Sequence, residues 1–389
     1  MRPFLHRRLA QLVIAVLTFL AYSASITRKE KIRVHSQQIT KPLILFSPTS
    51  GLGNSIFGLI SVARLADILK ADFGVVWTNS TTPALQIRYE DIFAGSIVYG
   101  TSEDAYKKMC GHTCSVKLTH RATLACEMAM TCPNATELLT RVAKCSCLHV
   151  HSNRYYPSLF QASDGTNSFM ELTRKHLKPS VRLRQATTHT LNVWKKMNVS
   201  TIIGVHVRAA FISSEVKNGK FVPQKDIFAR YFWSCVRESA QVQGIVGVFV
   251  AADTEQVRQE AHLLVQRHPN MRFLPSPLQI FPNDLDLGPQ RDTTTSWGAA
   301  IEMQLLSRSS TLIVKGSESM IDSTFSSAAV AFANCVDSTL CKITDGVKCH
   351  NISDHAAVKR FKHGRVKSCE HLSIMHENLP IENQTCRIS

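Results

Sequence analysis

The second half of the chain repeats one order, in which a short apolar run rich in β-branched residues alternates with a longer stretch of helical periodicity. The apolar runs have the length and composition of buried strands, and they cover Thr201–Ala209, Val246–Asp253 and Thr311–Ser317. The helical stretches occupy residues 254–268, 295–310 and 323–333. Strands that alternate with helices predict a parallel sheet covered on both faces. The predicted fold class is therefore α/β, with ligands bound beyond the carboxyl ends of the strands.

A similar unit opens the first half. The apolar run Leu43–Phe46 predicts a strand, and the glycine-containing turn Ser50–Asn54 follows it. Beyond this turn, five apolar residues recur at helical spacing and predict one buried face: Ile56, Leu59, Ile60, Ala63 and Ala66. We place a first domain at residues 42–195 and a second at residues 196–345.

Composition limits the partners that the chain can have. With 389 residues, 44% of them hydrophobic and 19% charged, it is long enough for two globular domains. The formal net charge is +16, but the basic residues are scattered rather than gathered in one arm. Nucleic acid is therefore not expected as a partner, because binding it requires aromatic side chains for base stacking and a longer basic surface. The charge fits an anionic small substrate or a membrane surface.

The N-terminus predicts entry into the secretory pathway. Arg2, Arg7 and Arg8 precede an uncharged run at residues 9–27, which is short for a membrane span and long for a signal peptide. We expect a signal anchor at residues 9–27, with a cytosolic tail at residues 1–8 and a stem at residues 28–41. The alternative is a signal peptide cleaved after Ser25, which would give a secreted protein.

Cysteines and glycosylation sequons agree with a lumenal domain in the Golgi or endoplasmic reticulum. The 12 cysteines form no repeated zinc-type pattern, so disulfides are expected. Six of them lie in a cysteine-rich insertion at residues 110–147, and five follow from Cys335, where residues 346–389 read as a disulfide-tethered tail. Sequons predict N-glycosylation at Asn79, Asn134, Asn198, Asn351 and Asn383.

The first candidate ligand group follows the first predicted strand. Gly51, Gly53 and Asn54 open a helix there, and backbone N–H groups at a positive helix end favour an anion. A plain glycine turn, with Asn54 capping the helix, is the simpler interpretation.

A second group lies near the end of the Thr201–Ala209 strand. His206 and Arg208 are two residues apart, which places them on one face of the strand. A guanidinium can hold a phosphate through two parallel hydrogen bonds, and an imidazole can bind a ribose or a base. The alternative is a strand that ends at the surface with two solvated polar side chains.

Two later strand ends add a carboxylate and a hydroxyl cluster. Asp253 can accept hydrogen bonds from a base or a ribose, or it can cap the helix that follows. Ser323, Thr324 and Ser326 bring hydroxyls to a helix start, where Phe325 can pack on a base; a simple N-cap cluster is the alternative. Together the four groups supply anion donors, a cation and a base reader, which fits a nucleotide diphosphate.

Four segments in this order resemble the motifs of GDP-fucose-dependent fucosyltransferases, the superfamily of α1,2-, α1,6- and protein O-fucosyltransferases. They read SGLGNSIFGLISVARLADIL, GVHVRAAF, VFVAADTEQVRQEAHLL and SWGAAIEMQLLSRSSTLIVKGSESMIDSTFSSAA. Each motif is loose, and the resemblance rests on their order and spacing between Leu43 and Cys335. It implies a GT-B fold, with two Rossmann-like domains that face a cleft, and an inverting transfer without a metal.

The resemblance also implies a role for each group. Asn54 would sit by the donor's pyrophosphate and fucose, and His206 would contact the nucleoside. Arg208 would hold the β-phosphate and offset charge on the leaving GDP, while Asp253 would read the guanine or the ribose. The phosphates and base would be enclosed by the residues that start the last helix, Ser323, Thr324 and Phe325.

One departure from the family bears on catalysis. Many relatives carry an acidic residue three positions after the motif arginine, where this chain has Phe211. Glu215 lies near the position of a catalytic carboxylate in some α1,6-type relatives, so it is our candidate for the base that deprotonates the acceptor. It also fits a solvated loop acid. Two alternatives stay open: a transferase for another nucleotide sugar, and a non-catalytic glycan-binding protein on an inactive scaffold.

A second acidic pattern would imply different chemistry. Asp284 and Asp286 have the DxD spacing with which metal-dependent glycosyltransferases bind Mn²⁺ and a nucleotide diphosphate. However, two carboxylates alone rarely complete a metal site. We therefore expect GDP-fucose as the donor substrate, no metal cofactor, and a hydroxyl of a glycan or glycoprotein as the acceptor.

Overall fold

The chain is described by a computed structural model at residues 43–48, 51–77, 87–95, 97–98, 147–152, 165–209, 214–217, 220–223, 225–241, 244–276, 293–317, 320–321, 323–333, 341–345 and 348–351. Contacts divide the chain into Met1–Thr40 and Lys41–Ser389, and every described residue belongs to the second unit. The predicted cytosolic tail, anchor and stem lie outside the described residues. Among the helices that are described, none is long and apolar enough to cross a membrane.

The first sheet forms around β1 (Leu43–Pro48), whose six residues are all buried. This strand lies between β2 (Asp72–Val75) and β5 (Cys147–Ser152), and β4 (Ile97–Val98) pairs with β2. All three pairings are parallel. α2 (Leu52–Leu69) follows β1, and it buries the five apolar positions that were predicted for its inner face.

Short elements lead from the first sheet to the second. α3 (Tyr89–Ile92) runs into β3 (Phe93–Gly95), which pairs antiparallel with β6 (Leu177–Pro179). The two longer helices are α7 (Gly165–His176) and α8 (Val181–Lys195). α8 begins where Ser180 Oγ accepts a hydrogen bond from the backbone N–H of Leu183 at 3.0 Å, which satisfies one of the free donors at a helix start.

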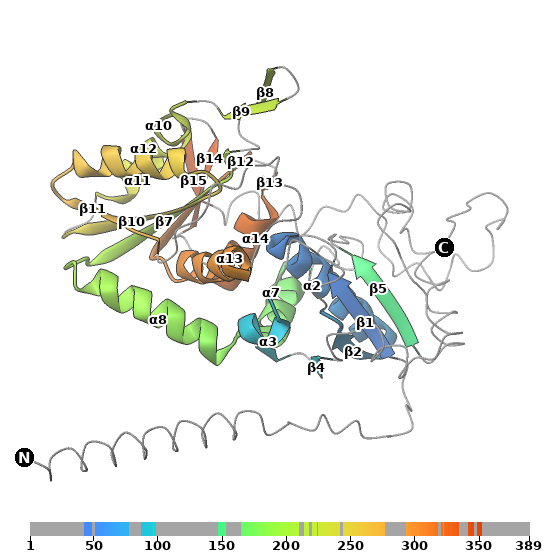
Figure 1. Cartoon of the computed structure of the whole chain (residues 1–389). Helices are drawn as coiled ribbons and strands as arrows, with labels where there is room; N and C mark the ends of the chain where they lie inside the picture. Colours follow the sequence, from blue (N-terminus) through green and yellow to red (C-terminus); the bar gives the residue numbers. More distant parts are fainter. Residues whose placement is uncertain are drawn as a thin grey trace, which may run out of the picture. The chain divides into compact units, whose positions relative to one another are not determined.

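The second sheet is the parallel sheet that the alternating pattern predicted (Figure 1). Its central strands are β7 (Thr201–Val207), β10 (Val246–Ala252) and β12 (Thr311–Ser317). The described strands run in the order β11-β10-β7-β12-β14-β15, where β11 is Met271–Leu274, β14 is Cys341–Asp345 and β15 is Lys348–Asn351. Neighbours in this order are parallel except β14 and β15, and the short β13 (Met320–Ile321) pairs antiparallel with β12. The predicted α/β class is confirmed.

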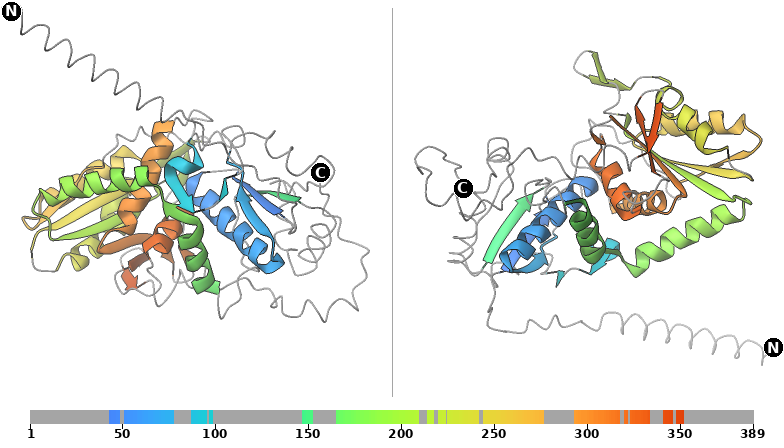
Figure 2. Two further views of the ribbon diagram at one scale, coloured as in Figure 1. Left: turned by 90° about the horizontal axis from the view of Figure 1, so that it is seen from below. Right: turned by 180° about the vertical axis from the view of Figure 1, so that it is seen from behind.

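Alternate residues of the central strands enter two different cores. On one face, apolar side chains of β7 and β10 pack with α10 (Ile227–Tyr231), α11 (Trp233–Ser239) and α12 (Glu255–Gln266). On the other face, β10 and β12 contribute to a core with α13 (Thr293–Ser307) and α14 (Thr324–Ala333). Figures 1 and 2 show α12 and α13 on opposite faces of the sheet. The second core also contains buried side chains of β1 and α2, so apolar contacts run from one sheet to the other.

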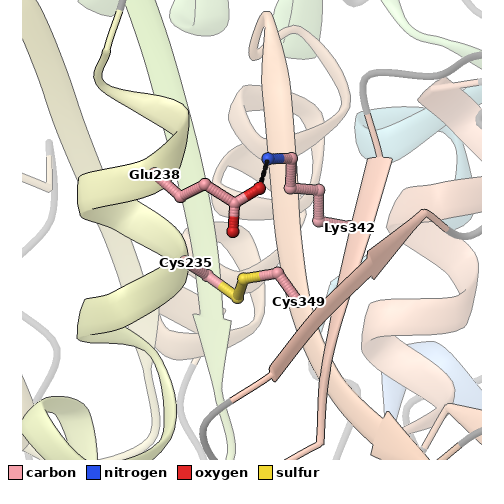
Figure 3. The surroundings of a disulfide bond; sticks show 4 residues. All are labelled: Cys235, Glu238, Lys342 and Cys349. Atoms are coloured by element: carbon pink, nitrogen blue, oxygen red, sulfur yellow. Dashed lines mark hydrogen bonds and ion pairs between the residues drawn. A yellow bond between two sulfur atoms is a disulfide. The ribbon is translucent and has the colours of Figure 1, made fainter.

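A disulfide between Cys235 and Cys349 ties α11 to the edge strand β15 (Figure 3). Beside it, Lys342 Nζ lies 3.0 Å from a carboxylate oxygen of Glu238, so α11 is also linked to β14. An ion pair this exposed contributes little to stability. The disulfide is therefore the stronger link, because it closes a segment with a sequence separation of 114 residues.

We expect the C235S/C349S double variant to lose about 4 kcal/mol of unfolding free energy, because the unfolded chain regains the entropy of a long loop. Urea denaturation under non-reducing conditions measures this loss. Each single variant breaks the same bond, so the double variant should be no less stable than either single variant. An unchanged denaturation midpoint would show that the bond contributes nothing.

Candidate functional site

The candidate site lies at the carboxyl edge of the second sheet, where β7 stands between β10 and β12. The chain leaves β7 toward β10 and β11 on one side, and it later returns to β12 on the other side. Parallel sheets bind ligands where the strand order reverses in this way. The polar residues that follow β7, β10 and β12 are those singled out from the sequence.

His206 is the next-to-last residue of β7, and it is buried rather than solvated. Its Nδ1 atom is hydrogen-bonded to Ser326 Oγ of α14. Its ring lies 4.9 Å from the ring of Phe325, centroid to centroid, with the planes tilted by 30°. The alternative of a strand end with solvated side chains is therefore wrong for His206, because α14 covers it.

Burial and the nearby charge of Arg208 lower the pKa of His206 to about 3. The imidazole is consequently neutral at physiological pH. A neutral ring can exchange hydrogen bonds with a ribose or a base, but it adds no positive charge to a phosphate site. Of the two residues, only Arg208, which directly follows β7, can therefore supply a positive charge.

This pKa predicts acid sensitivity. The pKa of His206 is lower in the folded protein than the usual 6.5, so the unfolded chain binds more protons between pH 6.5 and pH 3. The unfolding free energy should therefore fall by up to about 1.4 kcal/mol per pH unit as the pH drops through that window.

Urea denaturation between pH 7.5 and pH 5 measures this dependence. His206→Gln should reduce the slope but not remove it, because burial also lowers the pKa of His176, to about 4. A slope equal to that of the unmodified protein would mean that the pKa of His206 is the same in the folded and the unfolded chain.

Arg208 directly follows β7 and is half-buried, with its Nε atom buried. Asp253 directly follows β10, and its Oδ1 atom accepts a hydrogen bond at 2.8 Å from the backbone N–H of Ala209. The backbone N–H of Asp253 in turn donates to Val207 O at 3.4 Å. The two strand ends are thus tied together on either side of Arg208. The N-cap of α12 is Thr254, so the interpretation of Asp253 as the helix cap is wrong. The carboxylate of Asp253 binds the backbone after Arg208 instead.

The start of α14 completes this edge of the site. The backbone N–H of Phe325 donates to Ser323 Oγ at 3.2 Å, and Ser327 Oγ donates to Ser323 O at 3.0 Å. Ser323 therefore caps the helix, as the simpler interpretation proposed. Thr324 and Phe325 are half-buried in the first turn. A helix start carries a partial positive charge, and the first turn of α14 contacts His206 through Phe325 and Ser326.

The glycine turn of the first half reaches the same place. A Cβ atom built on Gly53 would lie 2.6 Å from Phe325 N, 2.8 Å from Phe325 Cα and 2.9 Å from the carbonyl carbon of Thr324. Only glycine allows this contact between the first turns of α2 and α14. Asn54 is half-buried in the same turn of α2. The helix begins at Leu52 with Gly51 as its N-cap residue, so the interpretation of Asn54 as the cap is wrong.

The side chains of the remaining catalytic and metal-binding candidates lie outside the described residues. Glu215 belongs to β8 (Ser214–Lys217), which pairs with β9 (Lys220–Pro223) in a separate two-stranded sheet. Its side chain lies outside the described residues, as do Phe211, Asp284 and Asp286. Among the glycosylation candidates, Asn198 is exposed in the turn between α8 and β7. In the described part of the chain, no group of three or more His, Cys, Asp or Glu side chains is arranged to hold a metal ion.

Sequence reasoning missed a buried ion pair beneath the site. Arg258 of α12 and Glu302 of α13 are 7% and 4% exposed, and their charged groups lie 2.7 Å apart. Arg258 resembles an ordinary charged position on the amphipathic helix α12, so it attracts no attention in the sequence. A hint was available in Glu302, which interrupts the apolar stretch WGAAIEMQLL.

Two parallel sheets, with polar groups from both halves meeting at the carboxyl edge of one of them, define an α/β protein with a candidate site for an anionic nucleotide. No family model matches the chain, and no curated protein matches its sequence. Solved structures do match it. The α-1,6-fucosyltransferase NodZ co-crystallised with GDP aligns at 15% identity and a TM-score of 0.46, over 78% of this chain and 94% of NodZ. POFUT1 in complex with GDP aligns at 11% identity and a TM-score of 0.48, over 78% of this chain and 99% of POFUT1.

A mutant of Arabidopsis thaliana FUT1 in complex with GDP aligns at a TM-score of 0.52 and 16% identity. The alignment covers 78% of this chain and 70% of FUT1. The chain therefore shares its fold with a fucosyltransferase structure, and the fold expected from the motif resemblance is confirmed at that level. The two parallel sheets fit a GT-B architecture.

Proposed function

We propose that this chain is a glycosyltransferase that transfers fucose from GDP-fucose to a hydroxyl of a glycan or glycoprotein. One observation carries the proposal: His206, Arg208, Asp253 and the start of α14 converge at the strand-order reversal of a sheet, in a fold shared with a GDP-complexed fucosyltransferase. The first turn of α2, at Gly53, reaches this convergence from the first half of the chain. The motif order in the sequence supports the same donor.

Each group has a part in donor binding. The guanidinium of Arg208 holds the β-phosphate, and Ser323, Thr324 and Phe325 at the start of α14 close on the phosphates and the base. Neutral His206 and Asp253 contact the nucleoside, and Asn54 lies by the pyrophosphate and fucose. Since His206 carries no charge, Arg208 supplies the positive charge from β7 that the leaving GDP needs.

The transfer itself is an inverting displacement. The acceptor oxygen forms a bond to C1 of fucose as the bond from C1 to the β-phosphate oxygen breaks, and GDP leaves with the electron pair. Glu215 takes the proton of the acceptor hydroxyl. Positive charge at the phosphates comes from Arg208 and the helix start rather than from a metal, and Asp284 and Asp286 are not required.

The reaction is tested by incubating the purified protein with labelled GDP-fucose, and in parallel with other labelled nucleotide sugars, over an array of glycan and glycoprotein acceptors. We expect labelled fucose on at least one acceptor, with the rate unchanged by EDTA. Transfer of a different sugar would show that the donor is another nucleotide sugar and not GDP-fucose. GDP binding without any transfer would favour a non-catalytic scaffold, and loss of activity in EDTA would favour the DxD pair.

We further propose a Golgi or endoplasmic reticulum location, with the catalytic part in the lumen and residues 9–27 as the anchor. The Cys235–Cys349 disulfide and the exposed sequon at Asn198 support this placement. Expression in a secretory cell line, followed by carbonate extraction and glycosidase digestion, examines it. A protein without N-glycans would oppose lumenal placement, and release into the medium would favour a cleaved signal peptide.

A further inference from the structure

We propose that the buried ion pair of Arg258 and Glu302 is a positioning device, which fixes the end of β10 and thereby the loop that carries Arg208. This inference rests on the proposed function for its meaning in donor binding. That the pair fixes the end of β10 is argued from the contacts of Arg258 and Glu302 alone.

The pair is bound to the backbone of the site. Arg258 Nη2 donates both to Glu302 Oε1, at 2.7 Å, and to Ala252 O, at 3.1 Å. Ala252 is the last residue of β10, directly before Asp253. Glu302 Oε1 also accepts a hydrogen bond at 2.9 Å from Ser276 Oγ, which lies just beyond β11. One guanidinium group thus connects α12, α13 and the end of β10.

From Ala252 the contacts lead to the phosphate-binding candidate. Asp253 Oδ1 accepts a hydrogen bond from the N–H of Ala209, the residue after Arg208. A shift of the β10 end would move Asp253 and release this N–H. The segment that carries Arg208 would then lose its tie to the neighbouring strand. Neither Arg258 nor Glu302 has to touch a ligand for this to weaken binding.

Burying two charged groups costs free energy, and this cost supports a role for the pair in positioning the end of β10. Burial raises the pKa of Glu302 to about 7, although Arg258 lowers it. In the described part of the chain, the buried Arg258 Nε atom also has no hydrogen-bond partner. Buried ion pairs of this kind can often be replaced by apolar side chains without loss of stability. Stability alone is therefore a weak reason for this pair, and the bond to Ala252 O is the contact that apolar residues cannot reproduce.

Apolar replacements should therefore restore stability without restoring the bond to Ala252 O, and variants can test this. Arg258→Met alone leaves Glu302 buried and unpaired, so it should lower both stability and donor affinity. The double variant R258M/E302M removes the unpaired charge and should regain much of the stability. If the pair positions the loop, GDP should still bind the double variant about 10- to 100-fold more weakly than the unmodified protein. Glu302→Gln keeps the shape and the acceptor oxygen, so it should retain most of the affinity.

Two measurements on each variant distinguish a displaced strand end from a loss of donor affinity. Hydrogen–deuterium exchange of the ligand-free protein reports on the Ala209 N–H, which should exchange faster in R258M/E302M. Calorimetric titration with GDP reports on donor affinity. Val265→Ala, on the same helix, is the control: it opens a cavity and lowers stability, but should change neither measurement at the site.

Recovery of both exchange protection and GDP affinity in R258M/E302M would overturn the proposal, since the pair would then serve charge balance only. If the unmodified protein binds no GDP, the proposed function fails, and the exchange experiment still decides whether the pair holds the strand end. Faster exchange confined to R258M and absent from the double variant would likewise count against positioning.

Discussion

Replacing Arg208 with alanine should reduce kcat/KM for fucose transfer by about 10³-fold, because a fixed guanidinium on a leaving phosphate acts where charge develops in the transition state. GDP affinity should also fall, since the product carries the same β-phosphate. Steady-state kinetics with varied GDP-fucose and calorimetry with GDP measure the two effects.

Two variants serve as controls for Arg208. Arg230→Ala removes an exposed arginine that stacks on Tyr231, with its guanidinium carbon 5.4 Å from the ring centre, and it should leave donor kinetics unchanged. Arg208→Lys keeps the charge but loses the bidentate geometry, so it should recover only part of the rate. Full activity in Arg208→Ala would remove this residue from the site.

A readout independent of activity accompanies the alanine variant. The charge of Arg208 contributes to the low pKa of His206, so this pKa should rise when the charge is removed. Burial should still hold it below the ordinary value. NMR titration of the His206 ring follows the change. An unaltered titration would place the guanidinium farther from the imidazole than the structure does.

Replacing Gly53 with alanine is the second change with a large expected effect. The new methyl group would meet backbone atoms of Thr324 and Phe325 at 2.6–2.9 Å, and these atoms cannot rotate away. The start of α14 must therefore move away from α2. Because α14 also holds His206 through Ser326, GDP affinity should drop by about 100-fold.

Gly204 provides the matched control. A Cβ atom there would also be crowded, with Ser309 Oγ at 2.4 Å and Leu306 Cδ2 at 3.2 Å, but these are side-chain atoms away from the carboxyl edge. Gly204→Ala should therefore lower the melting temperature and keep GDP affinity. Comparable affinities for Gly53→Ala and the unmodified protein would show that the contact between the two halves has no part in donor binding.

The fold was largely predictable because its strands and helices carry strong local patterns. β7, β10 and β12 are short apolar runs, and α2 places its predicted positions, such as Ile56 and Leu59, in the core. In a parallel sheet the carboxyl ends of the strands share one edge, which is why His206, Arg208 and Asp253 were expected near one another.

What was wrong or missed has one local cause and two that depend on contacts between distant segments. Asn54 looked like a helix cap, but α2 begins at Leu52 because Gly51 supplies its N-cap. His206 looked equally suited to a solvated strand end, and only the packing of α14 buries it. Arg258 and Glu302 are 44 residues apart in sequence and belong to different helices, and no local pattern encodes such a partner.

We propose that the edge formed by β7, β10 and α14 binds a guanosine diphosphate. Calorimetric titration of the purified protein with GDP, in the presence of EDTA and with UDP in parallel, addresses it most directly. We expect saturable binding of one GDP per chain, much weaker binding of UDP, and strongly reduced GDP binding by Arg208→Ala. Absence of GDP binding in the unmodified protein, or equal binding by the Arg208→Ala variant, would contradict it.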